Sequence, residues 1–525
     1  MNAVPRVLRN DWSGVTVPEL AGWQPTRSVS VIIPAYRCQA TLELTLASLS
    51  RQTYPADLLE VVVVDDGSEP ALTLPPIRPT RTTLARVGAG WGRANALAWG
   101  VRHSTGEILH WLDADMVVYP DHVAAQARWQ HVLPYAVTLG YKRFVDPETH
   151  GPWPTAAAVD DAWRRGEPDG LFGGAAGEPH SYVERYITQT DQLRTADHLA
   201  FRIHVGATAA LRRELYEAAG GFDTELRLGE DTEFGYRLAQ AGAVFVPEPA
   251  ARSWHLGRTQ VMQAREQVAR YNQAFFADRI PYPRHTRRSG GTAWTVPLAE
   301  VVIPVGDEPL ERIRAATDSV LHGTDLDVRV NLLGPWDRLD GARVSPLTDP
   351  HLDLRLIAAT YRGEPRVRLV TEPVTAFPAP YLLELPPAHR LAPDSLRHLV
   401  ELADHHQVGL IRVGTADPVG TADPAGTADP VLLWRTAAVR RAELVRAPGE
   451  SLGDAVTAVY GSREEAPTAI GITANEESAP AVAGRRKRPM PSTLEVGGVR
   501  SLARATVMVG RLTGRQLRAR LIRRG

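Results

Sequence analysis

Short apolar runs alternate with a segment of helical periodicity in the first quarter of the chain. Residues 29–36 and the four valines at 61–64 have the composition of strands that are buried on both faces of a parallel sheet. Between them, residues 42–49 carry leucines at helical spacing. Strand, helix and strand in this order predict a βαβ unit. The apolar run at residues 108–112 predicts a further strand.

Pairs of carboxylates follow two of these predicted strands directly. Asp65 and Asp66 come after the valine run, and Asp113 and Asp115 come after residues 108–112. Open α/β sheets bind ligands at the carboxyl ends of their strands, so these groups are expected at a binding site. Hard carboxylate oxygens suit Mg²⁺ or Mn²⁺ holding a diphosphate. Taken alone, an Asp-x-Asp motif is more often a solvated turn or a helix cap.

Six motifs occur in order between residues 28 and 260. They are Val31-Ile32-Ile33-Pro34-Ala35-Tyr36, Val64-Asp65-Asp66-Gly67-Ser68, Gly92-Arg93-Ala94-Asn95, Gly106-Glu107 through Asp113-Ala114-Asp115, Gly220-Gly221-Phe222-Asp223, and Gly229-Glu230-Asp231. In order and approximate spacing, this half of the chain resembles the family 2 glycosyltransferases, which are nucleotide-sugar-dependent and inverting. The resemblance implies the α/β fold class, with a GT-A-type, Rossmann-like, mostly parallel sheet flanked by helices.

The resemblance also implies roles for individual residues. The donor is expected to contact Pro34, Ala35, Tyr36, Asp65, Asp66, Arg93, Asn95, Asp113 and Ala114. Mn²⁺ or Mg²⁺ is expected at Asp113, Asp115 and His255, where it would act as a Lewis acid on the leaving group. Imidazole suits Mn²⁺ better than Mg²⁺.

Asp231 matches the family's catalytic carboxylate and is the expected general base, with Glu230 in reserve. Simpler explanations exist for several of these side chains. The carboxylates at 230–233 could merely cap the helix that follows them. Arg93 could lie on the surface, and His255 could be packed in the core beside a tryptophan.

These roles predict a metal-dependent, inverting glycosyltransferase with a UDP-sugar as the expected donor. The expected acceptor is a cell-envelope glycan or a lipid-linked hydroxyl, and residues 141–205, which carry no family motif, are expected to shape its site. One alternative is a nucleotidyltransferase of similar sheet topology, which would normally bring a Gly-rich phosphate loop with a lysine. Another is a noncatalytic carbohydrate-binding scaffold, against which the intact Asp113, Asp115 and Asp231 argue.

A second, degraded copy of the same pattern follows. Residues 300–333 repeat the strand, helix and strand of residues 30–64, and residues 381–388 match residues 108–115 at a constant offset. The carboxylates are missing from this copy: Pro386 and Ala388 replace Asp113 and Asp115, Ala455 replaces Asp231, and Gly334-Pro335-Trp336 replaces Asp65-Asp66-Gly67. We predict a glycosyltransferase-like domain without catalysis, although an unrelated α/β domain could show the same order of elements.

The predicted organisation has four parts. They are an N-terminal extension at 1–27, a catalytic domain at 28–290, the degraded copy at 297–475, and a linker with a basic tail at 476–525. Within the copy, Gly-Thr-Ala-Asp-Pro occurs three times between residues 414 and 430, which is typical of a flexible loop. Residues 462–483, acidic and then rich in Ala and Pro, have the composition of a linker.

The net charge of −1 conceals a marked asymmetry. Residues 485–525 carry twelve Lys or Arg and one acid, a net +11, which leaves −12 on the rest of the chain. Apolar residues interleave with these arginines as in a basic amphipathic helix that contacts an anionic membrane. A solvated terminus, or a helix packed on the acidic body, would have the same composition. No nucleic-acid partner is expected, because the chain carries no recognition motif for one.

The lengths of the apolar runs and the cysteine count bear on the cellular compartment of the protein. No run of 18 apolar residues occurs, and the opening residues lack an apolar signal core, so we expect a cytoplasmic protein, which a membrane-binding tail would hold at the inner face of the cell membrane. The single cysteine, Cys38, excludes an intramolecular disulfide framework.

Overall fold

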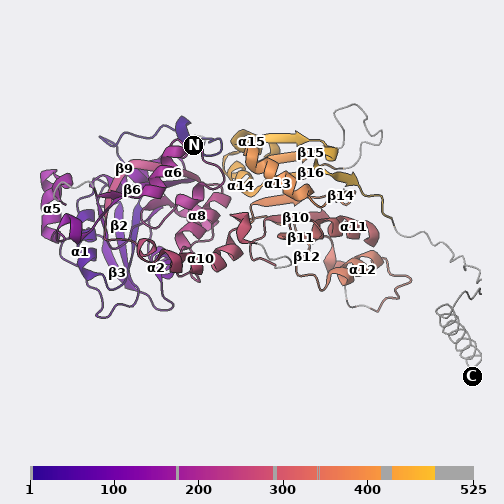
Figure 1. The fold of residues 1–525 in the computed structure, drawn as a ribbon, viewed down its shortest axis with the longest axis horizontal. Helices are drawn as coiled ribbons and strands as arrows, with labels where there is room; N and C mark the ends of the chain where they lie inside the picture. The colour runs from indigo at the N-terminus through magenta and orange to yellow at the C-terminus, as the bar shows by residue number, and fades with distance from the viewer. Residues whose placement is uncertain are drawn as a thin grey trace, which may run out of the picture. The chain divides into compact units, whose positions relative to one another are not determined.

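The computed structural model describes residues 4–172, 177–287, 293–339, 341, 343–414 and 429–478. Residues up to Glu477 form one compact unit, which contains two large β-sheets (Figure 1). Among the described residues, no helix is both long enough and apolar enough to cross a membrane. The predicted basic tail and residues 415–428 of the predicted repeat loop lie outside the described residues.

The first sheet begins with four parallel strands in the order β3-β2-β1-β4. These are β1 (Val29–Ala35), β2 (Leu59–Asp65), β3 (Thr82–Arg86) and β4 (Ile108–Trp111). Helix α1 (Gln39–Leu49) connects β1 to β2, and α2 (Arg93–Arg102) connects β3 to β4. The βαβ unit that the apolar pattern predicts is therefore present.

Successive residues of β1 face opposite sides of this sheet. Val31 and Ile33 share a buried cluster with Leu42, Leu46 and Leu49 of α1, whereas Ile32 shares one with α2. The two helices consequently cover opposite faces of the sheet (Figure 1). A strand covered on both faces has no solvent side, which explains why its sequence does not alternate between apolar and polar residues.

Further strands complete the first sheet: β5 (Met116–Val118), β6 (Ala136–Val145), β7 (Glu178–Pro179), β8 (Ala209–Arg212) and β9 (Val244–Leu256). Strand β8 runs antiparallel to β4 and β6, and β9 runs parallel to β6. The helices of this part are α3 (His122–Val132), α4 (Pro147–His150), α5 (Ala156–Arg165), α6 (Ser181–Gln189), α7 (Arg213–Ala218), α8 (Glu230–Gln240), α9 (Gln260–Gln263) and α10 (Arg265–Arg279). Helices α4 to α6 lie in the interval that the sequence assigns to the acceptor.

The second sheet has the order β12-β11-β10-β13-β16-β15-β17. Its strands are β10 (Ala299–Pro304), β11 (Val328–Leu333), β12 (Val367–Val370), β13 (Tyr381–Glu384), β15 (Leu410–Val413), β16 (Val431–Arg435) and β17 (Ser462–Glu465), while β14 (His389–Leu391) pairs separately with β18 (Ile472–Ala474). The helices are α11 (Leu310–Leu321), α12 (Leu352–Tyr361), α13 (Ser395–His406), α14 (Thr436–Val445), α15 (Leu452–Tyr460) and α16 (Pro467–Ile470).

The strand order of the second sheet repeats that of the first, β3-β2-β1-β4-β8-β6-β9, with the same directions at each pairing. In both sets of seven strands the first four are parallel, the fifth is antiparallel to its neighbours, and the sixth and seventh are parallel to each other; the first sheet continues with β5, which is antiparallel to β9. Backbone hydrogen bonds outside the ladders recur too: Leu112 N donates to the Ile32 carbonyl, and Leu385 N donates to the Val302 carbonyl. This correspondence supports the predicted repeat of the fold.

The same correspondence aligns the site positions. Leu256 N donates to the Asp115 carbonyl at 2.8 Å, and Asn475 N donates to the Ala388 carbonyl at 2.7 Å. Met116 pairs with His255 between β5 and β9, as His389 pairs with Ala474 between β14 and β18. Ala474 therefore stands where the first sheet has His255, a replacement that the sequence comparison did not detect.

The linker-like composition of residues 462–483 misleads over its first part. Residues 462–483 have the composition of a linker, but residues 462–474 form β17, α16 and β18. Strand β17 pairs in parallel with β15, with Ser462 opposite Leu410, and so belongs to the second sheet. Charged side chains are tolerated there because β17 is an edge strand that needs one buried face at most.

Arg441 joins elements of both sheets. Its side chain is buried, with 1% of the residue exposed, and Nε donates to the Gly242 carbonyl at 2.8 Å. One terminal nitrogen donates to the Ala243 carbonyl at 2.7 Å, and the other reaches the carbonyls of Val7 and Arg9. The guanidinium thus satisfies carbonyls from the end of α8 and from the N-terminal segment, next to a buried cluster that both sheets share.

Replacing Arg441 by Met should therefore destabilise the compact unit. The change keeps an apolar stem but leaves several buried carbonyls without donors, so we expect a loss of about 3 kcal/mol or more in the free energy of unfolding. Arg440→Met is the control, because among the described residues the Arg440 side chain pairs with Glu443 alone, at the surface. Urea denaturation followed by circular dichroism measures both; equal losses would contradict this role.

Candidate active site

The carboxyl ends of the parallel strands bring the predicted metal ligands together. Asp113 and Asp115 follow β4, and His255 lies on β9 opposite Met116. One ligand atom from each of these three residues lies within 4.8 Å of the other two. The His255 Nε2 to Asp115 Oδ1 distance is 3.8 Å. Two carboxylates and an imidazole that converge from two strands could together hold a divalent cation.

The hydrogen bonding around this cluster also fits a cation. Asp115 Oδ1 is buried and has no hydrogen-bond partner among the described residues, and burial raises the pKa of this carboxyl. His255 Nδ1 lies 3.0 Å from the Gly257 carbonyl. In the tautomer in which Nδ1 donates to that carbonyl, the Nε2 lone pair faces Asp115. The residues present therefore fit a divalent cation.

Arg93, at the start of α2, bridges two parts of the site. Its Nε donates to Asp113 Oδ1 and one terminal nitrogen donates to Glu230 Oε1, both at 2.8 Å. Burial alone would raise the pKa of Asp113, but the positive charge of Arg93 lowers it. Burial raises the pKa of Glu230 against the same positive charge. Arg93 is therefore not a free surface arginine, and Glu230 forms an ion pair with it.

Asp231 is held at the beginning of α8 by backbone N–H groups. Its Oδ2 accepts from Gly206 N and its Oδ1 accepts from Thr232 N, both at 2.6 Å. A Cβ placed on Gly206 would lie 3.6 Å from Asp231 Oδ2 and 3.7 Å from Asp113 Oδ2. The predicted base and the predicted metal cluster therefore converge on one point, which Gly206 keeps open.

The two acids after β2 differ in their environment. Asp65 is buried, and its carboxylate accepts from Ser68 N at 2.7 Å and Leu72 N at 3.3 Å, which organises the following loop. Asp66 Oδ2 accepts from Gly92 N at 2.7 Å, whereas its Oδ1 is buried and has no partner among the described residues. Of the pair, Asp66 is the one with an acceptor left for a ligand.

The other predicted donor contacts lie around the same edge of the sheet. Pro34 and Ala35 end β1, Tyr36 is 53% exposed just beyond them, and Ala114, between Asp113 and Asp115 in the sequence, is buried. Asn95 is mostly buried, and its Nδ2 donates to the Ala89 carbonyl at 3.0 Å. Asn95 therefore braces the loop before α2.

Three neighbours of the site were not identified from the sequence. Lys142 of β6 is buried and donates to the Ala207 carbonyl at 2.6 Å, and burial lowers its pKa. His204 Nδ1 lies 2.7 Å from the Asp231 carbonyl, and Arg227 stacks on the exposed Trp91 ring at 4.6 Å. Of these three residues, Lys142 is the one that the sequence could have singled out, because a lysine is unusual within an otherwise apolar run such as residues 136–145.

The fold belongs to the class of α/β proteins in which side chains that bind a ligand gather at the carboxyl ends of parallel strands. Residues 30–220 match the model described as Glycosyl transferase family 2, and residues 180–284 match the model described as Glycosyl transferase family 21. Residues 30–220 therefore match a family 2 glycosyltransferase domain, and the resemblance carried by the six motifs is confirmed.

Several known proteins are similar to this chain. The chondroitin synthase of Escherichia coli is 25% identical over 359 residues, which is 66% of this chain and 50% of that enzyme. The hyaluronan synthase of Pasteurella multocida is 25% identical over 370 residues, again 66% of this chain but 35% of that enzyme. The validoxylamine A glucosyltransferase of Streptomyces hygroscopicus subsp. limoneus is 28% identical over 235 residues, 43% of this chain and 50% of that enzyme. The chain thus spans half or less of each relative.

Among solved structures, a mannosyltransferase from Pyrobaculum calidifontis in complex with GDP-Man and Mn²⁺ is 22% identical, with a TM-score of 0.33. The match covers 51% of this chain and 68% of that protein.

Substitution of a proposed metal ligand and substitution of the proposed base should have different effects. Asp115→Asn should weaken Mn²⁺ binding, because it removes a charged ligand from the cluster. Asp231→Asn should leave Mn²⁺ binding nearly intact and lower the transfer rate by about 10²- to 10⁴-fold, the usual range for losing a general base. Calorimetry and single-turnover transfer measure the two effects, with the exposed Asp121→Asn as control. Wild-type transfer by Asp231→Asn would show that another group is the base.

Proposed function

We propose that this chain is a metal-dependent, inverting glycosyltransferase that moves a sugar from a nucleotide diphosphate to an acceptor hydroxyl. The observation that carries the proposal is the convergence of the Asp113, Asp115 and His255 ligand atoms within 4.8 Å of one another. Asp231 supports it, because its carboxylate approaches the same glycine as Asp113 does. The cation that binds the diphosphate leaving group would therefore lie next to the base that accepts the proton of the acceptor hydroxyl.

In this proposal each charged group has one task. A divalent cation at Asp113, Asp115 and His255 would stabilise the negative charge of the departing diphosphate. Asp231 accepts the proton of the attacking hydroxyl, and the Gly206 and Thr232 N–H groups hold its oxygens in place. Arg93 positions Asp113 and Glu230 relative to each other. Asp66 Oδ1 is available to accept a hydrogen bond from the nucleoside.

We propose a UDP-sugar as donor and Mn²⁺ or Mg²⁺ as cofactor. The proposed acceptor is a glycan or lipid-linked hydroxyl of the cell envelope. Relatives named chondroitin synthase, hyaluronan synthase and validoxylamine A glucosyltransferase support a glycan or glycoside as acceptor. A nucleotidyltransferase is disfavoured by the family match, and an inert scaffold is disfavoured by the assembled Asp113, Asp115 and Asp231.

We further propose that residues 297–475 are a noncatalytic copy of the catalytic domain. The repeated strand order supports this, as do Pro386, Ala388 and Ala474 at the positions of the three metal ligands. Ala455, in α15, takes the place of Asp231 in α8. A diphosphate bound there would lack both its cation and the carboxylates that hold the cation. A partner, an acceptor polymer or the catalytic domain itself is the expected ligand of this copy.

A panel of nucleotide sugars tests the proposed activity. In the presence of Mn²⁺, at least one UDP-sugar should be hydrolysed slowly to UDP, and EDTA should abolish the reaction. Proton NMR of the products of transfer should show an inverted anomeric configuration. Hydrolysis that EDTA does not affect, or a retained configuration, would contradict the proposal.

The basic tail is proposed to bring the enzyme to the inner face of the cell membrane. Each well-placed Lys or Arg should contribute about 1 kcal/mol of attraction to an anionic leaflet, and salt should screen it. Flotation with phosphatidylglycerol liposomes compares the full chain with a chain ending at Gly484. The full chain should float at low salt and the truncated chain should not. Equal binding by both would rule out the tail as the anchor.

A further inference from the structure

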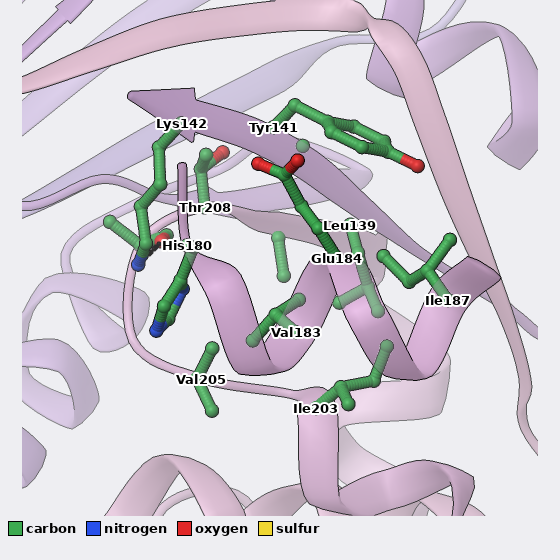
Figure 2. Close-up of a pocket in the computed structure, with 13 residues that line it drawn as sticks. Leu139, Tyr141, Lys142, His180, Val183, Glu184, Ile187, Ile203, Val205 and Thr208 are labelled. Atoms are coloured by element: carbon green, nitrogen blue, oxygen red, sulfur yellow. Dashed lines mark hydrogen bonds between the residues drawn. The ribbon is translucent and has the colours of Figure 1, made fainter. Parts of the chain in front are cut away.

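A polar cavity lies at the amino ends of three neighbouring strands of the second sheet. Its lining comes from residues between 293 and 297 before β10, from residues 327–329 at the start of β11, and from Pro365, Arg366 and Arg368 at the start of β12. Its volume is about 220 Å³, whereas the cavity between β6 and α6 beside the candidate active site (Figure 2) has about 30 Å³ and holds only water.

Three arginines line the larger cavity, and they differ in their partners. Arg329 donates to Glu300 Oε1 at 2.7 Å and to two backbone carbonyls. Arg366 donates from two of its nitrogens to the two oxygens of Glu364, at 3.0 and 3.2 Å. Arg368 is exposed, and its guanidinium has no hydrogen bond or ion pair with any of the described residues. The donors of Arg368 are therefore available to a ligand.

Counter-charges do not neutralise this cavity. Asp327, the one acid in its lining, already pairs with Arg284 and Arg287. The charged lining residues and the charged groups paired directly with them comprise five arginines and three carboxylates, a net charge of +2. The next pair outward, Asp325 and Arg397, adds one charge of each sign. A hollow with a net positive charge attracts anions.

The first sheet provides a control for this charge, because the same strand ends occur there. Val61 N donates to the Arg81 carbonyl, and Val330 N donates to the Arg366 carbonyl. These two hydrogen bonds hold the edge strand at the same register in both sheets, so Arg366 is the counterpart of Arg81. An arginine at this position is common to both copies of the fold.

The other two arginines have no counterpart in the first sheet. The strand registers place Glu60 where the second sheet has Arg329, and Thr83 where it has Arg368. Glu300 replaces a neutral serine and returns one negative charge. At these three positions the net charge rises by 2 from the first sheet to the second. The fold does not require this positive charge, which instead favours a ligand at this edge of the second sheet.

The donors and the volume of the cavity define the class of ligand. A guanidinium binds the oxygens of a carboxylate or a phosphate in a bidentate manner, and the exposed Thr295 hydroxyl is a further donor in the lining. The volume is below the range of about 300–1,000 Å³ that is typical of small-molecule sites, so the cavity suits one anionic group and not a whole sugar chain.

We infer that this cavity binds a single oxyanion through Arg368, supplied by the carboxylate of an acidic sugar or by inorganic phosphate. The cavity lies at the amino ends of the strands, whereas the proposed catalytic residues of the first sheet follow the carboxyl ends. It is therefore no remnant of a donor site, and the inference does not rest on the transfer reaction.

Thermal unfolding of the full chain tests the inference. The Tm is measured against increasing sodium glucuronate, sodium phosphate and glucose, with sodium chloride holding the ionic strength constant, and its rise gives each dissociation constant. At least one of the two oxyanions should stabilise wild type, and glucose should not. Stabilisation by glucuronate alone identifies an acidic sugar as the ligand, and stabilisation by phosphate alone identifies phosphate. Arg368→Gln should weaken binding about tenfold, the effect of losing charge-assisted hydrogen bonds.

Arg362→Gln is the matched control, because this arginine is also exposed but does not line the cavity. It should bind the anion as wild type does. Thr295→Glu, which brings a carboxylate into the lining, should weaken binding as well and provides a second variant. An anion bound elsewhere, such as at the candidate active site, would stabilise Arg368→Gln as much as wild type. That result, or stabilisation of wild type by neither oxyanion, would overturn the inference.

Discussion

The guanidinium of Arg93 holds the candidate active site together. It pairs with Asp113 at the end of β4 and with Glu230 in the first turn of α8, two residues far apart in the chain. Leaving either carboxylate buried without a cation would be costly, so the end of the sheet and the start of α8 are fixed relative to each other. Asp231, the next residue of α8, is thereby set beside the cluster of Asp113, Asp115 and His255. One ion-paired arginine thus links the proposed metal site to the proposed base.

The repeat of the fold separates what stability requires from what chemistry requires. Both sheets keep the strand order, the directions of the strands and the backbone hydrogen bonds at equivalent places. These features depend on apolar strands and on backbone geometry, and both survive in the second sheet. Carboxylates at the strand ends contribute little to such a core, so Pro386 and Ala388 can replace them without changing the fold. The lack of a carboxylate at Pro386 and Ala388, the positions equivalent to Asp113 and Asp115, is what supports a single catalytic centre.

Apolar periodicity and motif order were sufficient to predict the βαβ start, the fold class and the family, because these signals are local. The pairing of Arg93 with Glu230 was not predictable, since 137 residues separate them and either charge could have been solvated. Lys142 and the N–H of Gly206 were missed for the same reason: their roles arise from contacts between β6, the segment 203–209 and α8. The linker prediction at residue 462 failed because an edge strand with exposed charges has the composition of a loop.

The central claim is that one chain has two copies of this fold but only one metal centre. Counting the Mn²⁺ ions bound per chain tests this claim directly, by electron paramagnetic resonance of free Mn²⁺ during titration of the full chain in the presence of UDP. The account predicts one tightly bound ion per chain, because only the first copy brings two carboxylates and an imidazole together among the described residues. Two equivalent ions per chain, or none, would contradict it.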